Sequence, residues 1–185
     1  PLFGTPTYYT NLLAQSSLST DAMKLIILPG NSLRNKEWAD EATLAAREHF
    51  SDIYTHYYKH WETGEKFINF PLEVERVSEV MSASDSCAVL AKSIGTVLAT
   101  YLNHTGKIKI AKALYTGVPL GDKPDQASDL VTWIASLTAP TTIIQNTDDP
   151  YTTHAQIKNF LDPLHLPNVT LLETPGANHD YLDFD

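Results

Sequence analysis

The chain has 185 residues and 43% of them are hydrophobic, which is enough apolar material for one compact domain with a buried core. Its formal net charge of -9 excludes the basic surface that would attract nucleic acid or an anionic membrane. No apolar run approaches the roughly 18 residues of a membrane-spanning helix, so we expect a soluble protein without nucleic-acid or membrane partners.

The start of the chain and its single cysteine add to this description. The first 22 residues show little hydrophobic periodicity and lack the basic region and apolar stretch of a signal peptide. We therefore expect an N-terminal leader over 1–22 and a single domain over 23–185. Because the sequence starts at Pro1 rather than at a methionine, we expect it to begin inside a longer chain. Cys87 has no cysteine partner, which fits a buried thiol in a reducing, cytoplasmic compartment.

The first half of the domain alternates between strand and helix signals. Residues 24–28 form a short apolar run that Pro29-Gly30 ends, which predicts a buried strand. Residues 53–58 are rich in aromatic and branched side chains and predict a second strand. A helix is expected after each strand. Trp38, Ala42, Ala45 and His49 recur at helical spacing in the first, and Val74, Val77 and Met81 mark one apolar face of the second.

The second half continues the alternation. Apolar runs bounded by turn residues predict four more strands, over 87–91, 108–115, 141–145 and 169–172. The helix after the first of these strands is apolar all round and should end near Gly106. Two later helices follow from apolar residues at helical spacing, namely Leu130, Ile134 and Leu137, and then Ile157, Phe160, Leu161 and Leu164.

Strands that alternate with helices of ten or more residues are typical of repeated βαβ units. Right-handed crossovers between such strands produce a parallel sheet with helices on both faces. The sequence therefore predicts the α/β class, as a three-layer α/β/α sandwich with a mainly parallel sheet of about six strands. Ligands bind outside the carboxyl ends of the strands in such sheets, so the loops that follow the strands should carry the chemistry.

The turn around Ser93 is the most specific feature of the sequence. The segment Ala91-Lys92-Ser93-Ile94-Gly95 lies between an apolar strand and an apolar helix, as in the G-x-S-x-G nucleophile elbow. Small residues at both ends of such a turn let the two backbones approach closely and hold the serine in a strained conformation. The hydroxyl is then exposed beside a helix N-terminus, which predicts a nucleophile.

Two later loops supply an acid and a base. Asp148 and Asp149 follow the predicted strand 141–145, and His179 follows the strand 169–172. A serine hydroxyl is a weak nucleophile until a histidine takes its proton, and that histidine needs a carboxylate to hold its tautomer. The three loops therefore predict a Ser-His-Asp triad. Spacing alone leaves the choice between Asp148 and Asp149 open.

At these loops the chain resembles the α/β-hydrolase fold, and more closely its small lidless branch, the serine hydrolases similar to retinoblastoma-binding protein 9. The resemblance spans 24–182, and its matching pieces are Leu28-Pro29-Gly30-Asn31, Lys92-Ser93-Ile94-Gly95, Thr147-Asp148-Asp149-Pro150 and Asn178-His179. Two positions depart from the family pattern. Ala91 replaces the usual first glycine of the elbow, and Lys92 stands where family members often carry a histidine or an aromatic residue.

The resemblance implies roles for individual residues. Asp149, immediately before the proline, would be the triad acid, and the backbone N–H groups of Ile94 and Asn31 would form the oxyanion hole. It also implies no cofactor, no metal and no lid domain. The expected function is a carboxylesterase-like serine hydrolase that cleaves a small ester, thioester or amide through an acyl-enzyme intermediate. We expect one open, shallow substrate pocket bordered by 116–129 and 61–71.

Other interpretations of the same residues point elsewhere. The alternative function is a protein-binding or scaffolding module that keeps the fold with a weak or vestigial triad. Asp149 could instead cap a helix that starts at the proline after it.

His56 and His60 would lie roughly 13 Å apart on a strand, too far to share a metal ion. His154, near the acid loop, is expected on a helix face rather than as a substitute base.

Overall fold

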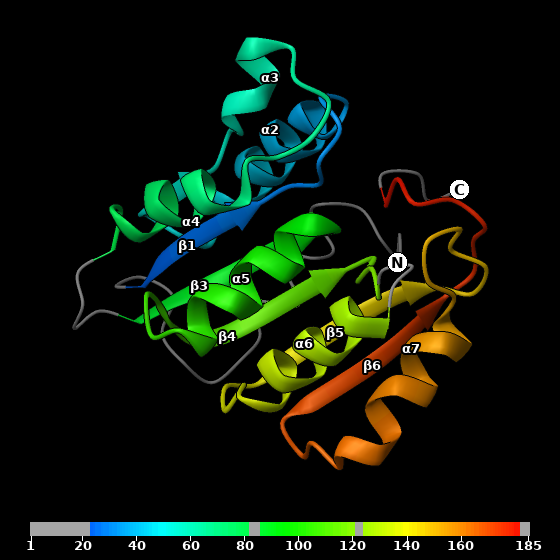
Figure 1. Cartoon of the computed structure of the whole chain (residues 1–185). Helices are drawn as coiled ribbons and strands as arrows, with labels where there is room; N and C mark the ends of the chain where they lie inside the picture. Colours follow the sequence, from blue (N-terminus) through cyan, green and yellow to red (C-terminus); the bar gives the residue numbers. More distant parts are fainter. Residues whose placement is uncertain (1–22, 82–85, 121–123, 182–185) are drawn as a thin grey trace.

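The computed structural model describes residues 23–81, 86–120 and 124–181 (Figure 1). The predicted leader over 1–22 lies outside the described residues, so the boundary between leader and domain stays a prediction. Among the residues that are described, no helix combines the length and the apolar character needed to cross a membrane.

Six strands form one sheet, and every pair of neighbouring strands in it is parallel. The strands are β1 (Lys24–Leu28), β2 (Ile53–Thr55), β3 (Ser86–Lys92), β4 (Lys109–Thr116), β5 (Thr141–Asn146) and β6 (Val169–Thr174). Their order across the sheet is β2-β1-β3-β4-β5-β6. The predicted parallel sheet of six strands is confirmed, and the carboxyl ends of all its strands lie at one edge.

Helices cover both faces of this sheet. They are α2 (Asn35–Ala46), α3 (Lys59–Thr63), α4 (Phe70–Ser78), α5 (Ile94–His104), α6 (Pro124–Ala135), α7 (His154–Leu161) and the 3-10 turn η1 (Asp162–Leu164). Buried side chains of α4, α5, α6 and α7 share one core, whereas α2 supplies the other. Figure 1 shows α5 and α6 side by side on the face of the sheet that they cover. The three-layer arrangement predicted from the sequence is therefore confirmed.

The strands divide their side chains between the two cores. In β1, Leu25 and Ile27 belong to the core that contains Trp38 of α2, whereas Ile26 and Leu28 belong to the core beneath α5. These four side chains are fully buried, because both faces of a parallel sheet are covered. This explains why the strand reads as an uninterrupted apolar run.

Several boundaries differ from the predictions, and the first helix is one of them, since α2 ends at Ala46 and His49 lies beyond it. The second strand was expected to run to Tyr58 but ends at Thr55, because its only partner β1 ends and Pro29 has no N–H to continue the ladder. The residues after it enter α3, a short helix that the sequence did not predict. Helix α4 ends at Ser78, so Met81 lies beyond the helix whose face it was expected to share.

Candidate active site

Ser93 occupies the turn between β3 and α5, in a backbone conformation that non-glycine residues rarely adopt (φ 53°, ψ -125°). Hydrogen bonds fix the backbone on both sides of it. Its N–H donates to the carbonyl of Thr116 (2.9 Å), and its carbonyl accepts from the N–H and the hydroxyl of Thr96 (2.8 and 2.7 Å). The strained turn predicted from the sequence is present.

Gly95 allows this turn to pack against the end of β1. A Cβ at this position would lie 2.1 Å from the carbonyl oxygen of Leu28 and 2.7 Å from that of Pro29. Only glycine therefore fits, because both obstacles are backbone atoms that cannot rotate away. At the other end of the turn, Ala91 stands where the G-x-S-x-G pattern has its first glycine, and it is fully buried in the core beneath α5.

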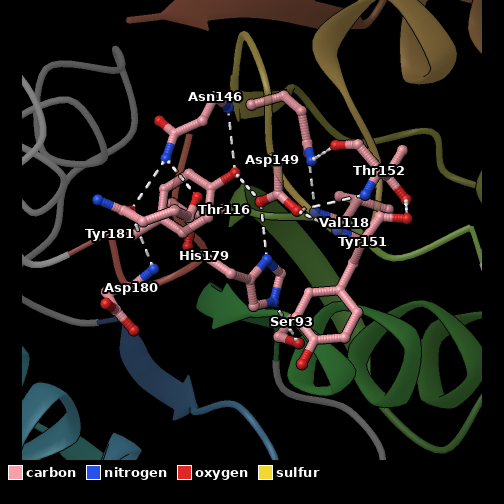
Figure 2. Close-up of polar contacts among 12 residues, drawn as sticks. Ser93, Thr116, Val118, Asn146, Asp149, Tyr151, Thr152, His179, Asp180 and Tyr181 are labelled. Atoms are coloured by element: carbon pink, nitrogen blue, oxygen red, sulfur yellow. Dashed lines mark hydrogen bonds and ion pairs between the residues drawn. The ribbon is translucent and has the colours of Figure 1, made fainter. Parts of the chain in front are cut away.

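His179 bridges Ser93 and Asp149. Its Nε2 lies 2.8 Å from the Ser93 hydroxyl oxygen, and its Nδ1 lies 2.7 Å from Oδ2 of Asp149 (Figure 2). A carboxylate can only accept, so the Nδ1–H donates to Asp149 and leaves the Nε2 lone pair to accept from the serine hydroxyl. The structure thus joins the three predicted residues in one chain of hydrogen bonds.

Asp149 is buried, and both of its oxygens are occupied. Oδ1 accepts from the backbone N–H groups of Tyr151 (2.9 Å) and Thr152 (3.2 Å). Burial raises the pKa of the Asp149 carboxyl, but hydrogen bonds from His179, Tyr181 and the backbone outweigh it and hold that pKa below its usual value. Asp148 is exposed and has no such contact with the histidine, so the geometry favours Asp149 of the two candidates.

Tyr181 is part of this arrangement, and sequence reasoning missed it. Its hydroxyl donates to Oδ2 of Asp149 (2.7 Å) and accepts from the backbone N–H of Asn146 (3.1 Å). The side chain is fully buried, and its backbone has a φ of 51°. Gly117 makes room for it, because a Cβ there would lie 2.5 Å from Cε2 of Tyr181. No local sequence signal marks such a residue, since its contacts are distant along the chain.

Asn146 ties the loop that carries His179 to the end of β5. Its amide nitrogen donates to the carbonyl of Asn178 (2.9 Å), and its amide oxygen accepts from the hydroxyl of Thr174 (2.7 Å). Gly176 leaves room for this amide, because a Cβ there would lie 3.0 Å from Cγ of Asn146. The position of the histidine therefore depends on polar contacts within this edge of the sheet.

The two predicted oxyanion donors lie where the start of α5 packs against the end of β1. Ile94 is the first residue of α5, and Asn31 follows β1, whose end α5 touches. Within the described part of the chain, neither backbone N–H has a hydrogen-bond partner. Both groups are therefore available to bind an oxygen atom near Ser93.

Side chains around Asn31 hold it in place. Its carbonyl accepts from Nε2 of His60 (2.8 Å) and Nε1 of Trp61 (2.7 Å), both on the unpredicted helix α3. Its side-chain oxygen accepts from the N–H of Ile68 (3.0 Å), and its amide nitrogen donates to the carbonyl of Lys66 (3.1 Å). This segment thus fixes the direction of the Asn31 backbone.

Comparison with known proteins identifies the fold of the chain. No protein-family model and no curated protein matches the sequence. Among solved structures, an esterase of Pyrococcus furiosus matches with a TM-score of 0.62 and 15% identity, over 88% of this chain and 77% of the esterase. A monoacylglycerol lipase of Paleococcus ferrophilus matches with a TM-score of 0.62 and 12% identity, over 85% of this chain and 86% of the lipase.

A third match is an α/β-hydrolase enzyme from a Medee basin deep-sea metagenome library, with a TM-score of 0.57 and 13% identity. It covers 89% of this chain and 85% of that enzyme. The chain has the α/β-hydrolase fold. In this α/β-hydrolase sheet, Ser93 follows β3, Asp149 follows β5 and His179 follows β6, so all three lie at the carboxyl edge.

Two hollows border the site. One, of about 340 Å³, lies between α5, α6 and the loop after β4, and its lining includes Ile94, Val97, Leu120, Leu130 and Trp133. The other, of about 470 Å³, lies between the loop after β1 and the residues around α3, and its lining includes Asn31, Trp61, Lys66, Phe67 and Tyr151. Both segments expected to border the substrate pocket meet at the first hollow, which Phe70 lines from one side and Pro119, Leu120 and Asp129 line from the other, whereas of these two segments only 61–71 borders the second hollow.

Lys92, the neighbour of Ser93, points away from solvent. Its ammonium donates to Oδ1 of Asn35 (2.7 Å) and lies 5.8 Å from the ring centroid of Trp38. Burial lowers the pKa of Lys92 to about 8, although Asp180 and Asp149 act in the opposite direction. This residue supports α2 against β3.

Three other histidines have structural partners. His56 Nε2 donates to the buried carboxylate of Glu73 (2.9 Å), and His60 donates to the Asn31 carbonyl, so the two do not share a ligand. His154 starts α7 and lies 3.6 Å from a carboxylate oxygen of Glu173. No group of three or more metal-binding side chains is assembled within the described residues.

Proposed function

We propose that this protein is a serine hydrolase. The observation that carries the proposal is the hydrogen-bond chain from Ser93 through His179 to the buried Asp149. This chain matches the chemical needs of a serine nucleophile: an acceptor for its proton and a carboxylate that stabilises the resulting imidazolium.

In the first step, Ser93 Oγ attacks the substrate carbonyl carbon while His179 Nε2 takes the hydroxyl proton. The carbonyl oxygen becomes an oxyanion, which the N–H groups of Ile94 and Asn31 stabilise. Collapse of this intermediate breaks the bond to the leaving group. The leaving group receives the proton from His179, and the acyl group remains on Ser93 as an ester.

In the second step, water replaces the leaving group. His179 takes a proton from water, whose oxygen attacks the acyl carbon, and then returns that proton to Ser93 Oγ as the acyl-oxygen bond breaks. The products are a carboxylic acid and free enzyme. Asp149 keeps its charge throughout, which its low pKa supports. No metal or cofactor takes part in this scheme.

The proposed substrates are small esters, thioesters or amides. Two structural neighbours are named as an esterase and a monoacylglycerol lipase, which supports carboxylesterase-like chemistry on this fold. The matching turn motifs support a place in the small lidless group similar to retinoblastoma-binding protein 9. The free, buried thiol of Cys87 supports a cytoplasmic location.

Turnover of p-nitrophenyl esters from acetate to octanoate tests this proposal. We expect Ser93→Ala to reduce kcat/KM at least about a thousandfold, with a melting temperature within a few degrees of the wild type. Ser136→Ala is the matched control and should keep full activity, because Ser136 follows α6 at the amino edge of the sheet, opposite the site. Well-folded protein without turnover would contradict the proposal and favour a scaffolding module, and full turnover by Ser93→Ala would assign the activity to another residue.

A further inference from the structure

The proton path of the proposed hydrolase determines where the two halves of a substrate lie. After bond cleavage, His179 must give its proton to the leaving group, so the leaving-group atom has to lie at the His179 side of the acyl carbon. The acyl group then extends from the opposite side of that carbon. Each of the two hollows beside Ser93 can therefore be matched to one half of the substrate.

The hollow between the loop after β1 and α3, which we call the Asn31–Tyr151 hollow, lies on the His179 side of the acyl carbon. Tyr151 lines it, and the Tyr151 ring packs edge-on against the imidazole of His179, with ring centroids 4.5 Å apart (Figure 2). Trp61 and Phe67 line the same hollow, and the Tyr151 and Phe67 side chains are more than 60% exposed. Exposed rings around an open hollow favour a flat aromatic group, which can stack on them without displacing other side chains.

Each hollow holds one of the two proposed oxyanion donors: Asn31 lines the Asn31–Tyr151 hollow, and the hollow between α5 and α6 lies beside the other donor. Ile94, whose N–H is that donor, is also part of its lining, together with Val97, Leu130 and Trp133. The lining is apolar apart from Asp129, the one ionisable residue among the described side chains that form it. An apolar chain attached to the acyl carbon can be buried here without losing hydrogen bonds to water.

From these two placements we infer the orientation of the substrate. The α5–α6 hollow binds an uncharged, apolar acyl chain, and the Asn31–Tyr151 hollow binds an aromatic leaving group. This assignment rests on the proposed function. It also predicts that Asp129 disfavours acyl chains that end in a carboxylate, because two negative charges would share the hollow.

A series of p-nitrophenyl esters with acetyl to octanoyl groups tests the acyl site. In the wild type, each added methylene should raise kcat/KM about fourfold until the hollow is filled. Val97→Phe narrows the hollow and should lower the octanoate-to-acetate ratio of kcat/KM about tenfold. An unchanged ratio in Val97→Phe, with substrate still cleaved, would overturn the acyl assignment.

Benzyl butyrate and methyl butyrate test the leaving-group site. Tyr151→Leu should lower the benzyl-to-methyl ratio of kcat/KM about fivefold, whereas Tyr151→Phe keeps the ring and should keep the ratio. Comparing ratios between variants cancels the intrinsic reactivity of the two esters. If Val97→Phe changes the benzyl-to-methyl ratio and Tyr151→Leu changes the acyl-length ratio, the assignment is reversed and therefore wrong.

A charged acyl chain tests the part assigned to Asp129. The ratio of kcat/KM for the p-nitrophenyl half-ester of adipate to that for the hexanoate ester should rise about fivefold in Asp129→Asn. Asp52→Asn, which removes an exposed carboxylate before β2, is the control for net charge and should leave this ratio unchanged. An equal rise in both variants would contradict a local effect of Asp129.

Labelling by a fluorophosphonate separates the two levels of failure. If Ser93 is labelled and esters are cleaved while all three ratios stay at their wild-type values, the orientation is wrong and the proposed function stands. If Ser93 is not labelled and no ester is cleaved, the proposed function fails and the orientation fails with it.

Discussion

Among single residues, Tyr181 explains how the buried carboxylate of Asp149 can stay charged, as the proposed triad requires. It supplies a hydrogen bond to the same oxygen of Asp149 that accepts from His179, and it also satisfies the backbone N–H of Asn146. Because the hydroxyl stabilises the charged form of the carboxyl, it helps to keep the pKa of Asp149 low. We regard Tyr181 as a positioning residue, since it acts through Asp149.

Tyr181→Phe should therefore reduce kcat/KM about tenfold, because a hydrogen bond to a charged group is lost. Its pH dependence distinguishes this role from a structural one. Without the hydroxyl, the Asp149 carboxylate loses one of the hydrogen bonds that lower its pKa, so this pKa rises. The acidic limb of the kcat/KM profile should move to higher pH.

A pH profile of ester hydrolysis for Tyr181→Phe and the wild type checks this. A loss of activity that is equal at every pH would contradict the role and leave Tyr181 as a packing residue. Circular dichroism and melting temperature show whether the variant is folded, so that loss of structure is not mistaken for loss of positioning.

At the scale of elements, the approach of α5 to β1 sets the geometry of the site. It brings Ile94 next to the Asn31 loop and depends on the missing Cβ of Gly95. Contacts between elements also fix the neighbouring strand β2. There Glu73 of α4 accepts from His56 after β2 and from the N–H of Lys59 at the start of α3.

Gly95→Ala should lower the free energy of unfolding by about 3 kcal/mol and reduce ester hydrolysis, because α5 must shift away from β1. Gly64→Ala is the matched control. Gly64 has a φ of 77° and no heavy atom near the new Cβ, so this change should cost only about 1 kcal/mol. Urea unfolding of both variants measures the difference. Equal costs would show that the close approach to Leu28 carries no penalty.

Glu73→Gln tests the buried pair that joins β2, α3 and α4. The Glu73 side chain is fully buried, and hydrogen bonds from His56, Lys59 and Arg76 outweigh burial and lower its pKa. A carboxyl whose pKa is lower in the folded state stabilises the fold above its unfolded pKa, and this stabilisation is lost as pH falls through the folded pKa. The variant should therefore lose about 2 kcal/mol of unfolding free energy at neutral pH and less at acidic pH.

Urea unfolding near neutral pH and below about pH 4 measures this difference. Glu75→Gln, an exposed carboxylate on the same helix, is the control and should change stability little at either pH. A cost of Glu73→Gln that is the same at both pH values would show that the charge of Glu73 does not contribute.

At the scale of the whole molecule, most of the fold could be predicted because periodicity reports it directly. Both faces of the sheet are covered, so strands such as β1 read as plain apolar runs between turn residues. The edge strand β2 was predicted too long, because strand length depends on the partner strand rather than on its own sequence. Helix α3 escaped prediction, since five residues give no periodicity.

Residues of the candidate site that follow a predicted strand could be found from the sequence. Residues placed by contacts between distant segments could not. Ser93 and His179 follow strands and could be found from position, whereas the choice of Asp149 over Asp148 needed a family resemblance or coordinates. Tyr181 and the two hollows depend on packing between segments far apart in the chain. No local pattern encodes such contacts.

In the proposed mechanism, His179 and Asp149 activate Ser93 as a nucleophile. Intact-mass measurement after treatment with a fluorophosphonate, followed by peptide mapping, tests it most directly. We predict one adduct per chain, located on Ser93, formed slowly in His179→Ala and not at all in Ser93→Ala. An unmodified mass in folded wild-type protein, or an adduct on another residue, would contradict it.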